Sequence, residues 1–88
     1  MDLKEPIVLL TGGSGGIGRE IVRSLILSGF SVWNLDMVRP QSPLLQETFR
    51  EINLAEAPFV LERSIQKILH ECQSMGEIYG IVHNAGFG

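Results

Sequence analysis

The feature that most constrains the fold is the stretch IVLLTGGSGGIGRE, residues 7–20, in which five glycines fall within seven residues after an apolar run. The run at 7–10 predicts a strand buried on both faces, as in a parallel sheet. From Gly16 the apolar residues recur at helical spacing, which predicts a helix that stops at Gly29, with Arg19 and Glu20 on its polar side. The glycines therefore form a strand-to-helix loop.

The rest of the chain continues this alternation of strands and helices. FSVWNLD, residues 30–36, predicts a second strand that ends in an acid, and two prolines predict a loop after it. TFREINL, residues 48–54, predicts a third strand with Ile52 and Leu54 alternating at its end. A helix with an apolar face that includes Met75 is expected from Pro58 to Gly76. The apolar run at 78–83 predicts a fourth strand.

Alternating strands and helices predict an α/β fold with a parallel sheet and right-handed crossovers. If the second and third strands lie successively to one side of the first and the fourth lies on its other side, the order is 3-2-1-4, with helices on both faces. The ligand crevice then opens where the order reverses, between residues 12–18 and 84–88. We expect one domain over residues 1–88.

Composition narrows the class of partner. The ten acidic and seven basic residues give a net charge of −3 without any basic cluster, which argues against nucleic acid. The single cysteine, Cys72, excludes an intrachain disulfide and a cysteine-based metal site, so a cytoplasmic location is expected. The four apolar residues after MDLKEP are too few for a signal peptide or a membrane span.

A glycine loop that opens a helix presents unpaired N–H groups and the positive end of the helix dipole, which favour an anion such as pyrophosphate. Gly12 permits the tight turn, Gly16 permits close approach of the phosphates, and Gly18 permits packing of the helix on the strand. A nucleoside-triphosphate loop needs Lys and then Ser or Thr after its last glycine, whereas Arg19 and Glu20 follow here. The alternative is a sharp turn with no ligand.

Asp36 ends the second strand about 20 residues beyond the glycine loop, where a carboxylate can accept hydrogen bonds from the ribose of a dinucleotide. The same carboxylate repels a 2′-phosphate, which favours NAD over NADP. Arg39, three residues later, is a cation that could reach such a phosphate. The alternative for Asp36 is a solvated turn acid.

TGGSGGIG fits the T-G-x-x-x-G-x-G fingerprint of the short-chain dehydrogenases/reductases, and HNAG, residues 83–86, resembles their N-N-A-G motif. The resemblance covers all 88 residues but only about the first third of a family member of roughly 250 residues. It implies the NAD(P)-binding part of a Rossmann-type three-layer sandwich.

The resemblance also implies which residues bind the cofactor. Pyrophosphate and adenosine ribose would contact the glycine loop, the ribose hydroxyls and adenine would lie near the ends of the second and third strands, and the last motif would form the opposite wall. In that order the residues are Gly12, Ser14, Gly16, Ile17 and Gly18, then Asp36, Met37, Asn53 and Leu54, then Asn84, Ala85 and Gly86.

Two departures from the family pattern matter. Asn53 and Leu54 replace the frequent Asp-Val or Asp-Leu, and an amide can still accept a hydrogen bond from the adenine amino group. His83 replaces the first Asn of N-N-A-G, and a structural role is favoured for it over a catalytic one.

The family's catalytic Ser and Tyr-x-x-x-Lys lie beyond N-N-A-G and are absent from this sequence. Tyr79, the only tyrosine, is followed four residues later by His83 and is interpreted as a packing residue. We therefore expect the dinucleotide-binding part of an oxidoreductase, truncated before its catalytic residues and inactive alone, that self-associates through the edge of its fourth strand.

Two other classes remain open: a non-catalytic nucleotide-binding or sensing module, and an interaction module that completes the sheet of another chain. A methyltransferase that uses S-adenosylmethionine also combines a glycine loop with an acid after the second strand, but the NAG at residues 84–86 favours the dehydrogenase interpretation.

Overall fold

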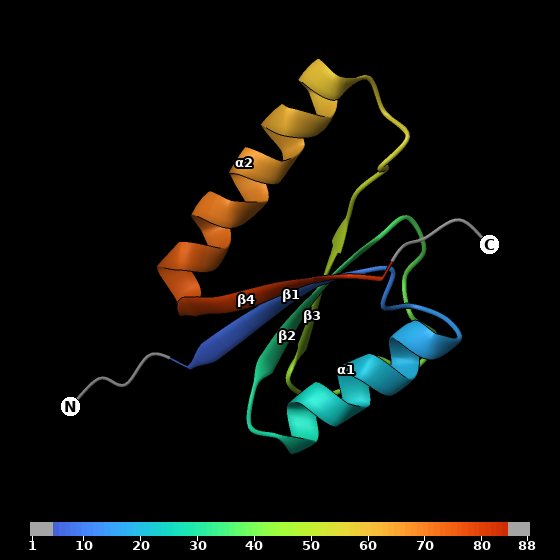
Figure 1. Ribbon diagram of the computed structural model, residues 1–88, viewed down its shortest axis with the longest axis vertical. Helices are drawn as coiled ribbons and strands as arrows, with labels where there is room; N and C mark the ends of the chain where they lie inside the picture. Colours follow the sequence, from blue (N-terminus) through green and yellow to red (C-terminus); the bar gives the residue numbers. More distant parts are fainter. Residues whose placement is uncertain (1–4, 85–88) are drawn as a thin grey trace.

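The computed structural model describes residues 5–84 and shows a four-stranded parallel sheet with one helix on each face (Figure 1). The sheet order β3-β2-β1-β4 confirms the predicted order 3-2-1-4. Along the chain the elements are β1 (Pro6–Thr11), α1 (Ile17–Leu27), β2 (Ser31–Asp36), β3 (Glu47–Glu51), α2 (Pro58–Met75) and β4 (Glu77–His83). None of the helices within residues 5–84 is long and apolar enough to cross a membrane.

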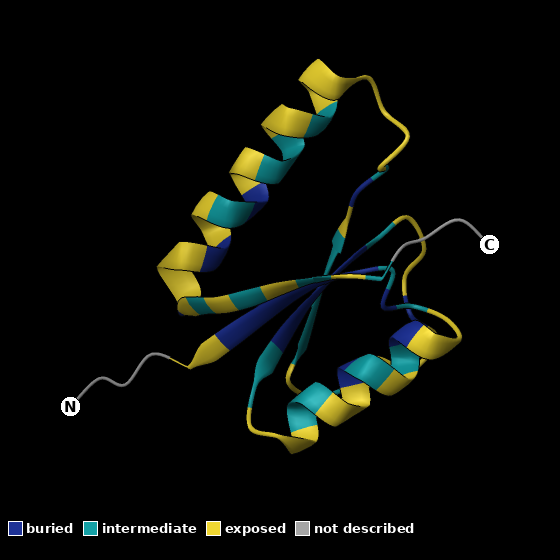
Figure 2. Ribbon diagram, viewed as in Figure 1, coloured by how far each residue is buried: buried dark blue, intermediate teal, exposed yellow. Residues whose placement is uncertain are grey.

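The core lies on both faces of β1 and β2, the two central strands (Figure 2). Leu9 and Trp33 are paired across these strands and belong to the core layer beneath α2. Leu10 and Val32 point to the opposite face and pack with Val22 of α1. Because strand residues alternate between faces, one continuous apolar run supplies both layers, as the prediction of a strand buried on both faces requires.

α1 ends where the sequence predicts. Gly29 has φ 99°, its N–H donates to the Ile26 carbonyl at 3.0 Å, and the Phe30 N–H donates to the Leu25 carbonyl at 3.1 Å. These two bonds form a Schellman motif, in which a left-handed glycine reverses the chain after the helix. The chain therefore turns directly from α1 into β2.

α2 begins with Pro58 in its first turn and ends before Gly76, as predicted. Ile68 and Cys72 of its apolar face are buried, but Met75 is 68% exposed. The prediction is wrong for Met75 because the helix extends past the edge of the core it covers.

The third strand ends earlier than predicted, at Glu51 instead of Leu54. The Ile52 N–H still donates to the Asp36 carbonyl at 3.0 Å, and the Ile52 side chain is buried. Leu54 is more than a third exposed, because the Asn53 side chain accepts a hydrogen bond from the Ala55 N–H and turns the chain away from the sheet.

β4 is irregular. Its register against β1 shifts between Ile7 and Val8, and Tyr79 is the extra residue at that shift. Tyr79 is 73% exposed and contacts the ring of Phe30, with centroids 4.9 Å apart. Tyr79 is therefore a packing residue, as predicted, and its ring contact lies at the surface. Ile81 is also exposed, at 64%.

Leu10→Ala should lower the free energy of unfolding by about 2–5 kcal/mol, because it opens a cavity between β1 and α1. Leu27→Ala is the matched control, since Leu27 is 82% exposed and its loss should change the free energy by less than about 0.5 kcal/mol. Urea denaturation followed by circular dichroism measures both. Equal effects of the two substitutions would contradict this core assignment.

Candidate functional site: the glycine loop and its crevice

The glycine loop makes a tight turn between β1 and α1. Gly12 has φ 73°, in the left-handed region, and its N–H donates to the Leu35 carbonyl at 2.9 Å. A Cβ on Gly18 would lie 2.0 Å from the Gly12 carbonyl oxygen, so only glycine fits there. Both glycines therefore have the geometry that the sequence predicts for a tight turn and a close helix-to-strand contact.

Three consecutive N–H groups at the start of α1 make no hydrogen bond within residues 5–84: those of Gly15, Gly16 and Ile17. All three residues are exposed. Gly16 has φ 53°, and a Cβ there would meet nothing within 4 Å, so the space in front of the loop is open. Unpaired N–H groups of exposed residues at the positive end of a helix dipole are suited to bind an anion.

Asp36 lies beside this loop at the carboxyl end of β2. Its Oδ2 accepts a hydrogen bond from the Ser14 N–H at 3.1 Å, and its Oδ1 accepts from the N–H groups of Met37 at 2.7 Å and Val38 at 3.4 Å. A carboxylate offers about four acceptor positions, so one on Oδ2 remains for a ligand. Asp36 thus stabilises the turn after β2, as the alternative interpretation of a turn acid predicts. Its carboxylate can still accept a hydrogen bond from a ligand.

A cavity of about 550 Å³ opens at the carboxyl ends of the strands. Five of the predicted cofactor-binding residues line it: Gly12, Asp36, Met37, Asn53 and Leu54. The other lining residues are Leu35, Ile52, Ala55, Leu61 and His83. Ser14, Gly16, Ile17, Gly18 and Asn84 do not line this cavity, and Ala85 and Gly86 lie outside the described residues. The cavity has apolar walls with an acid and an amide at its rim.

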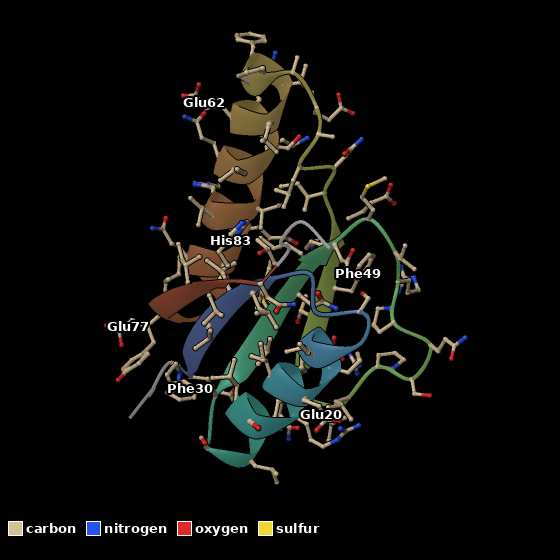
Figure 3. All side chains as sticks on the ribbon, turned by 45° about the vertical axis from the view of Figure 1, so that its right-hand side comes forward. Glu20, Phe30, Phe49, Glu62, Glu77 and His83 are labelled. Carbon is tan, nitrogen blue, oxygen red and sulfur yellow. The ribbon has the colours of Figure 1, made fainter. Side chains whose placement is uncertain are left out.

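The β4 side of the crevice is tied to the glycine loop. The Asn84 side-chain amide donates to the Gly12 carbonyl at 2.9 Å, and its N–H donates to the Thr11 hydroxyl at 3.0 Å. The same hydroxyl lies 3.0 Å from Nδ1 of His83, and Figure 3 shows His83 on the α2 side of the sheet. Asn84 and His83 therefore connect the end of β4 to the end of β1 and to the glycine loop.

A buried polar cluster beneath the loop is absent from the sequence-based predictions. Asn34 of β2 is fully buried, and its side-chain amide donates to Oε2 of Glu47 at 2.9 Å. Arg19 pairs with both Glu47 carboxylate oxygens, at 2.6 and 3.0 Å. Arg19 was expected on the solvent side of its helix, but its side chain is only 17% exposed. The sequence signal for this cluster is Asn34, a polar residue inside an apolar strand, because a buried amide needs hydrogen-bond partners.

Glu47 is ionised at neutral pH. Burial acts to raise its pKa, but hydrogen bonds from Arg19, the Leu44 N–H and Asn34, together with the charge of Arg19, outweigh burial and lower the pKa below its ordinary value. The cluster therefore contains an ion pair between the Arg19 guanidinium and the Glu47 carboxylate.

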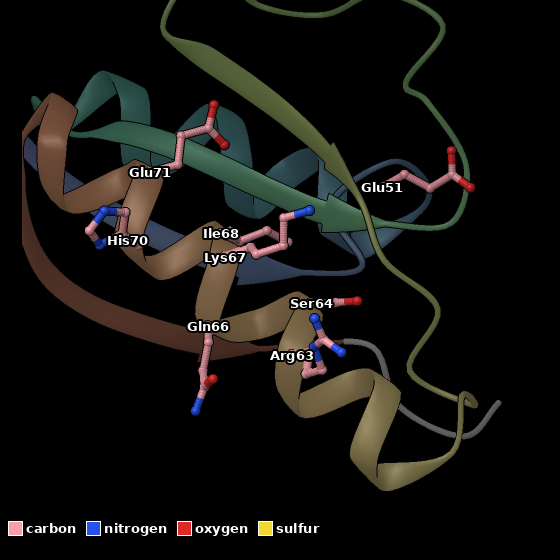
Figure 4. A pocket seen from close by; sticks show the side chains of 8 residues that line it. All are labelled: Glu51, Arg63, Ser64, Gln66, Lys67, Ile68, His70 and Glu71. Atoms are coloured by element: carbon pink, nitrogen blue, oxygen red, sulfur yellow. The ribbon is translucent and has the colours of Figure 1, made fainter.

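A second hollow lies between α2 and the end of β3, lined by Glu51, Arg63, Ser64, Gln66, Lys67, Ile68, His70 and Glu71 (Figure 4). It shares no lining residue with the cavity beside the glycine loop. Within residues 5–84, no group of three or more His, Cys, Asp or Glu side chains could hold a metal ion.

Comparison with known proteins identifies the family. A family model for short chain dehydrogenases matches residues 6–88. The chain belongs to the short chain dehydrogenase family. Over 82 residues it is 32% identical to L-fucose dehydrogenase from Mus musculus, an alignment that covers 92% of this chain and 30% of that enzyme.

Solved structures of this family share the fold. A short chain dehydrogenase family protein from Francisella tularensis is 26% identical with a TM-score of 0.71, and the alignment covers 98% of this chain and 32% of that protein. A short chain dehydrogenase from Leptospira borgpetersenii, solved with bound NAD⁺, is 24% identical with a TM-score of 0.74, covering 98% and 33%. The chain thus spans about a third of the length of these relatives.

Gly18→Ala should lower the free energy of unfolding by about 1–3 kcal/mol, because the added methyl group meets the Gly12 carbonyl and forces α1 away from β1. Gly15→Ala is the matched control: its Cβ would meet nothing, and its backbone has no positive φ, so a change below about 1 kcal/mol is expected. Chemical denaturation of both variants measures the difference. A Gly18 variant as stable as the wild type would refute the close contact.

Proposed function

We propose that this chain binds a nicotinamide dinucleotide as the cofactor-binding part of a short chain dehydrogenase. The observation that carries the proposal is the row of three unpaired N–H groups at Gly15, Gly16 and Ile17, with an open acceptor on Asp36 at the end of the adjacent strand. The N–H groups would take the pyrophosphate, and Asp36 would take the ribose hydroxyls.

The charges around the crevice favour NAD over NADP. Asp36 would repel a 2′-phosphate on the ribose that it binds. The guanidinium of Arg39 lies over the ring of Phe49, 5.1 Å from its centroid, and Arg19 is neutralised by Glu47. Arg19 is therefore not available to offset that repulsion, whereas Arg39 keeps its charge and is the residue that a 2′-phosphate would have to recruit. The NAD⁺ bound to the Leptospira relative is consistent with this preference.

The remaining cofactor contacts follow from the cavity at the strand ends. Met37, Asn53 and Leu54 line it beside Asp36 and would enclose the adenine. The walls around the phosphates and the nicotinamide side would be completed by Ser14, Asn84, Ala85 and Gly86. The Asn53 side-chain oxygen already accepts from the Ala55 N–H and keeps one acceptor position for the adenine amino group.

We propose that Tyr79 is not a proton-transfer group for the reaction. Tyr79, its only tyrosine, lies near the amino end of β4 against Phe30, whereas the crevice lies at the carboxyl end. A general acid must come within about 3 Å of the reacting oxygen. We therefore propose no catalytic activity for these 88 residues alone.

We also propose a cytoplasmic location, because the single cysteine, Cys72, is unpaired.

Calorimetric titration should show that NAD⁺ and ADP-ribose bind and that NADP⁺ binds more weakly. Asp36→Ala should weaken NAD⁺ binding about tenfold to hundredfold, since hydrogen bonds to a charged acceptor are lost. Glu51→Ala is the matched control, because Glu51 is the cross-strand partner of Asp36 on β3 but does not line the cavity. If no dinucleotide binds, the chain is better explained as a sheet-completing interaction module.

We also propose that the chain self-associates through β4. Its outer edge pairs with no strand among residues 5–84, and Tyr79 and Ile81 are exposed on it. An open apolar edge is a template for pairing with a second copy.

Sedimentation velocity should therefore detect dimers whose population rises with protein concentration. Ile81→Glu should shift the chain to monomer because it places a charge in that interface. Leu45→Glu, at a position 93% exposed in the loop before β3, should leave the dimer unchanged. A wild-type chain that stays monomeric at high concentration would count against pairing through β4.

A further inference from the structure

The carboxylate of Glu47 is fully buried and has every acceptor position filled. Its Oε1 accepts from Arg19 at 3.0 Å and from the Leu44 N–H at 3.0 Å, and its Oε2 accepts from Arg19 at 2.6 Å and from the Asn34 amide at 2.9 Å. Four donors therefore meet the four acceptor positions of one carboxylate. Such a charge is costly to bury unless it is paired, and here the pairing is complete.

The two side-chain partners of Glu47 reach the glycine loop from below. Arg19 donates to the Gly13 carbonyl at 3.1 Å, and the Asn34 side-chain oxygen accepts from the Gly13 N–H at 2.8 Å. The Asn34 amide also donates to the Ser14 hydroxyl at 3.1 Å. The N–H and C=O of Gly13 are thus both fixed by side chains that Glu47 orients.

The same cluster holds the loop between β2 and β3. Arg19 donates to the Ser42 carbonyl at 3.1 Å, the Leu44 N–H binds Glu47, and the Ser14 hydroxyl donates to the Val38 carbonyl. The glycine loop and the chain that follows Asp36 are therefore attached to one buried anchor.

We propose that Glu47 is a positioning residue for the pyrophosphate of the dinucleotide. This inference rests on the proposed function. Glu47 fixes Arg19 and Asn34, and these two fix Gly13. The fixed Gly13 in turn holds the N–H groups of the exposed residues that follow it, Gly15, Gly16 and Ile17, in one arrangement. A loop that is ordered before the ligand arrives loses less conformational entropy when the ligand binds.

Glu47→Gln tests the proposal because it keeps the size of the side chain and replaces one acceptor oxygen with an NH₂ group. Whichever way the amide turns, that group faces two donors, either Arg19 with Asn34 or Arg19 with the Leu44 N–H. The matched control is Glu71→Gln, which makes the same change in a bidentate Arg50–Glu71 pair on the exposed face of α2, at 2.9 and 2.6 Å.

Comparing the binding of NAD⁺ with that of adenosine distinguishes loss of phosphate positioning from general loss of structure. At a temperature where circular dichroism shows the variant folded, Glu47→Gln should raise the Kd for NAD⁺ at least tenfold. Binding of adenosine, which has no phosphate, should change less than twofold when followed by NMR. Amide exchange of Gly13 and Ser14 should accelerate at least tenfold, while exchange in α2 should not change.

Asn34→Ala provides a second variant if Glu47→Gln does not fold, since it keeps the Arg19–Glu47 pair. It removes the acceptor for the Gly13 N–H and the amide that donates to Glu47 and to the Ser14 hydroxyl. The same ligand and exchange pattern is expected for it.

The possible outcomes are distinct. If wild type binds NAD⁺ and the folded variants bind it equally well, or lose NAD⁺ and adenosine affinity alike, the positioning role is refuted and the proposed function stands. If Glu71→Gln weakens NAD⁺ binding as much as Glu47→Gln, the role is also refuted. If wild type binds no dinucleotide, the proposed function fails and the positioning role fails with it.

Discussion

The contact between the Cα of Gly18 and the carbonyl of Gly12 is the constraint on which the rest of the site depends. A side chain at Gly18 would place an atom 2.0 Å from that oxygen, so the absence of a Cβ is what lets α1 pack this closely on the end of β1. This close packing places the start of the helix, with its unpaired N–H groups, at the carboxyl edge of the sheet beside Asp36. The unpaired N–H groups and the acid thus share one edge because of a steric condition at a single residue.

Close packing of backbones alone does not fix the orientation of the peptide groups in a glycine-rich loop, because glycine adopts many conformations. In this chain the orientation is fixed by side chains from outside the loop. Asn84, which follows β4, holds the Gly12 carbonyl, and Asn34 and Arg19 hold Gly13 from beneath. The loop is therefore flexible by composition and ordered by its surroundings.

The element order and the glycine geometry could be predicted from the sequence because they follow from local patterns: an apolar run, a helical period and glycines at a turn. The sheet order does not follow from these patterns, and its prediction needed an assumption about the side of the first strand on which each later strand lies. The Arg19–Glu47 pair could not, because its partners are 28 residues apart and meet only after α1 packs on the sheet. Helical periodicity places Arg19 on the polar side of α1 without indicating that part of this side faces another strand. The prediction for Met75 is wrong for a related reason: a pattern marks apolar residues but not where the core ends.

The electrostatics of the site explain why geometry matters so much here. The chain has a net charge of −3, the charge of Arg19 beneath the loop is neutralised by Glu47, and Arg39 stacks on Phe49. A pyrophosphate at this loop would therefore be held mainly by backbone N–H dipoles and the end of α1, whose effect falls off within the first turn of the helix. Dipoles act only at short range and in the right direction, unlike a flexible lysine that can follow its ligand. A site of this kind depends on the exact placement of a few peptide groups, and in this fold that placement is maintained by buried side chains that the ligand would not touch.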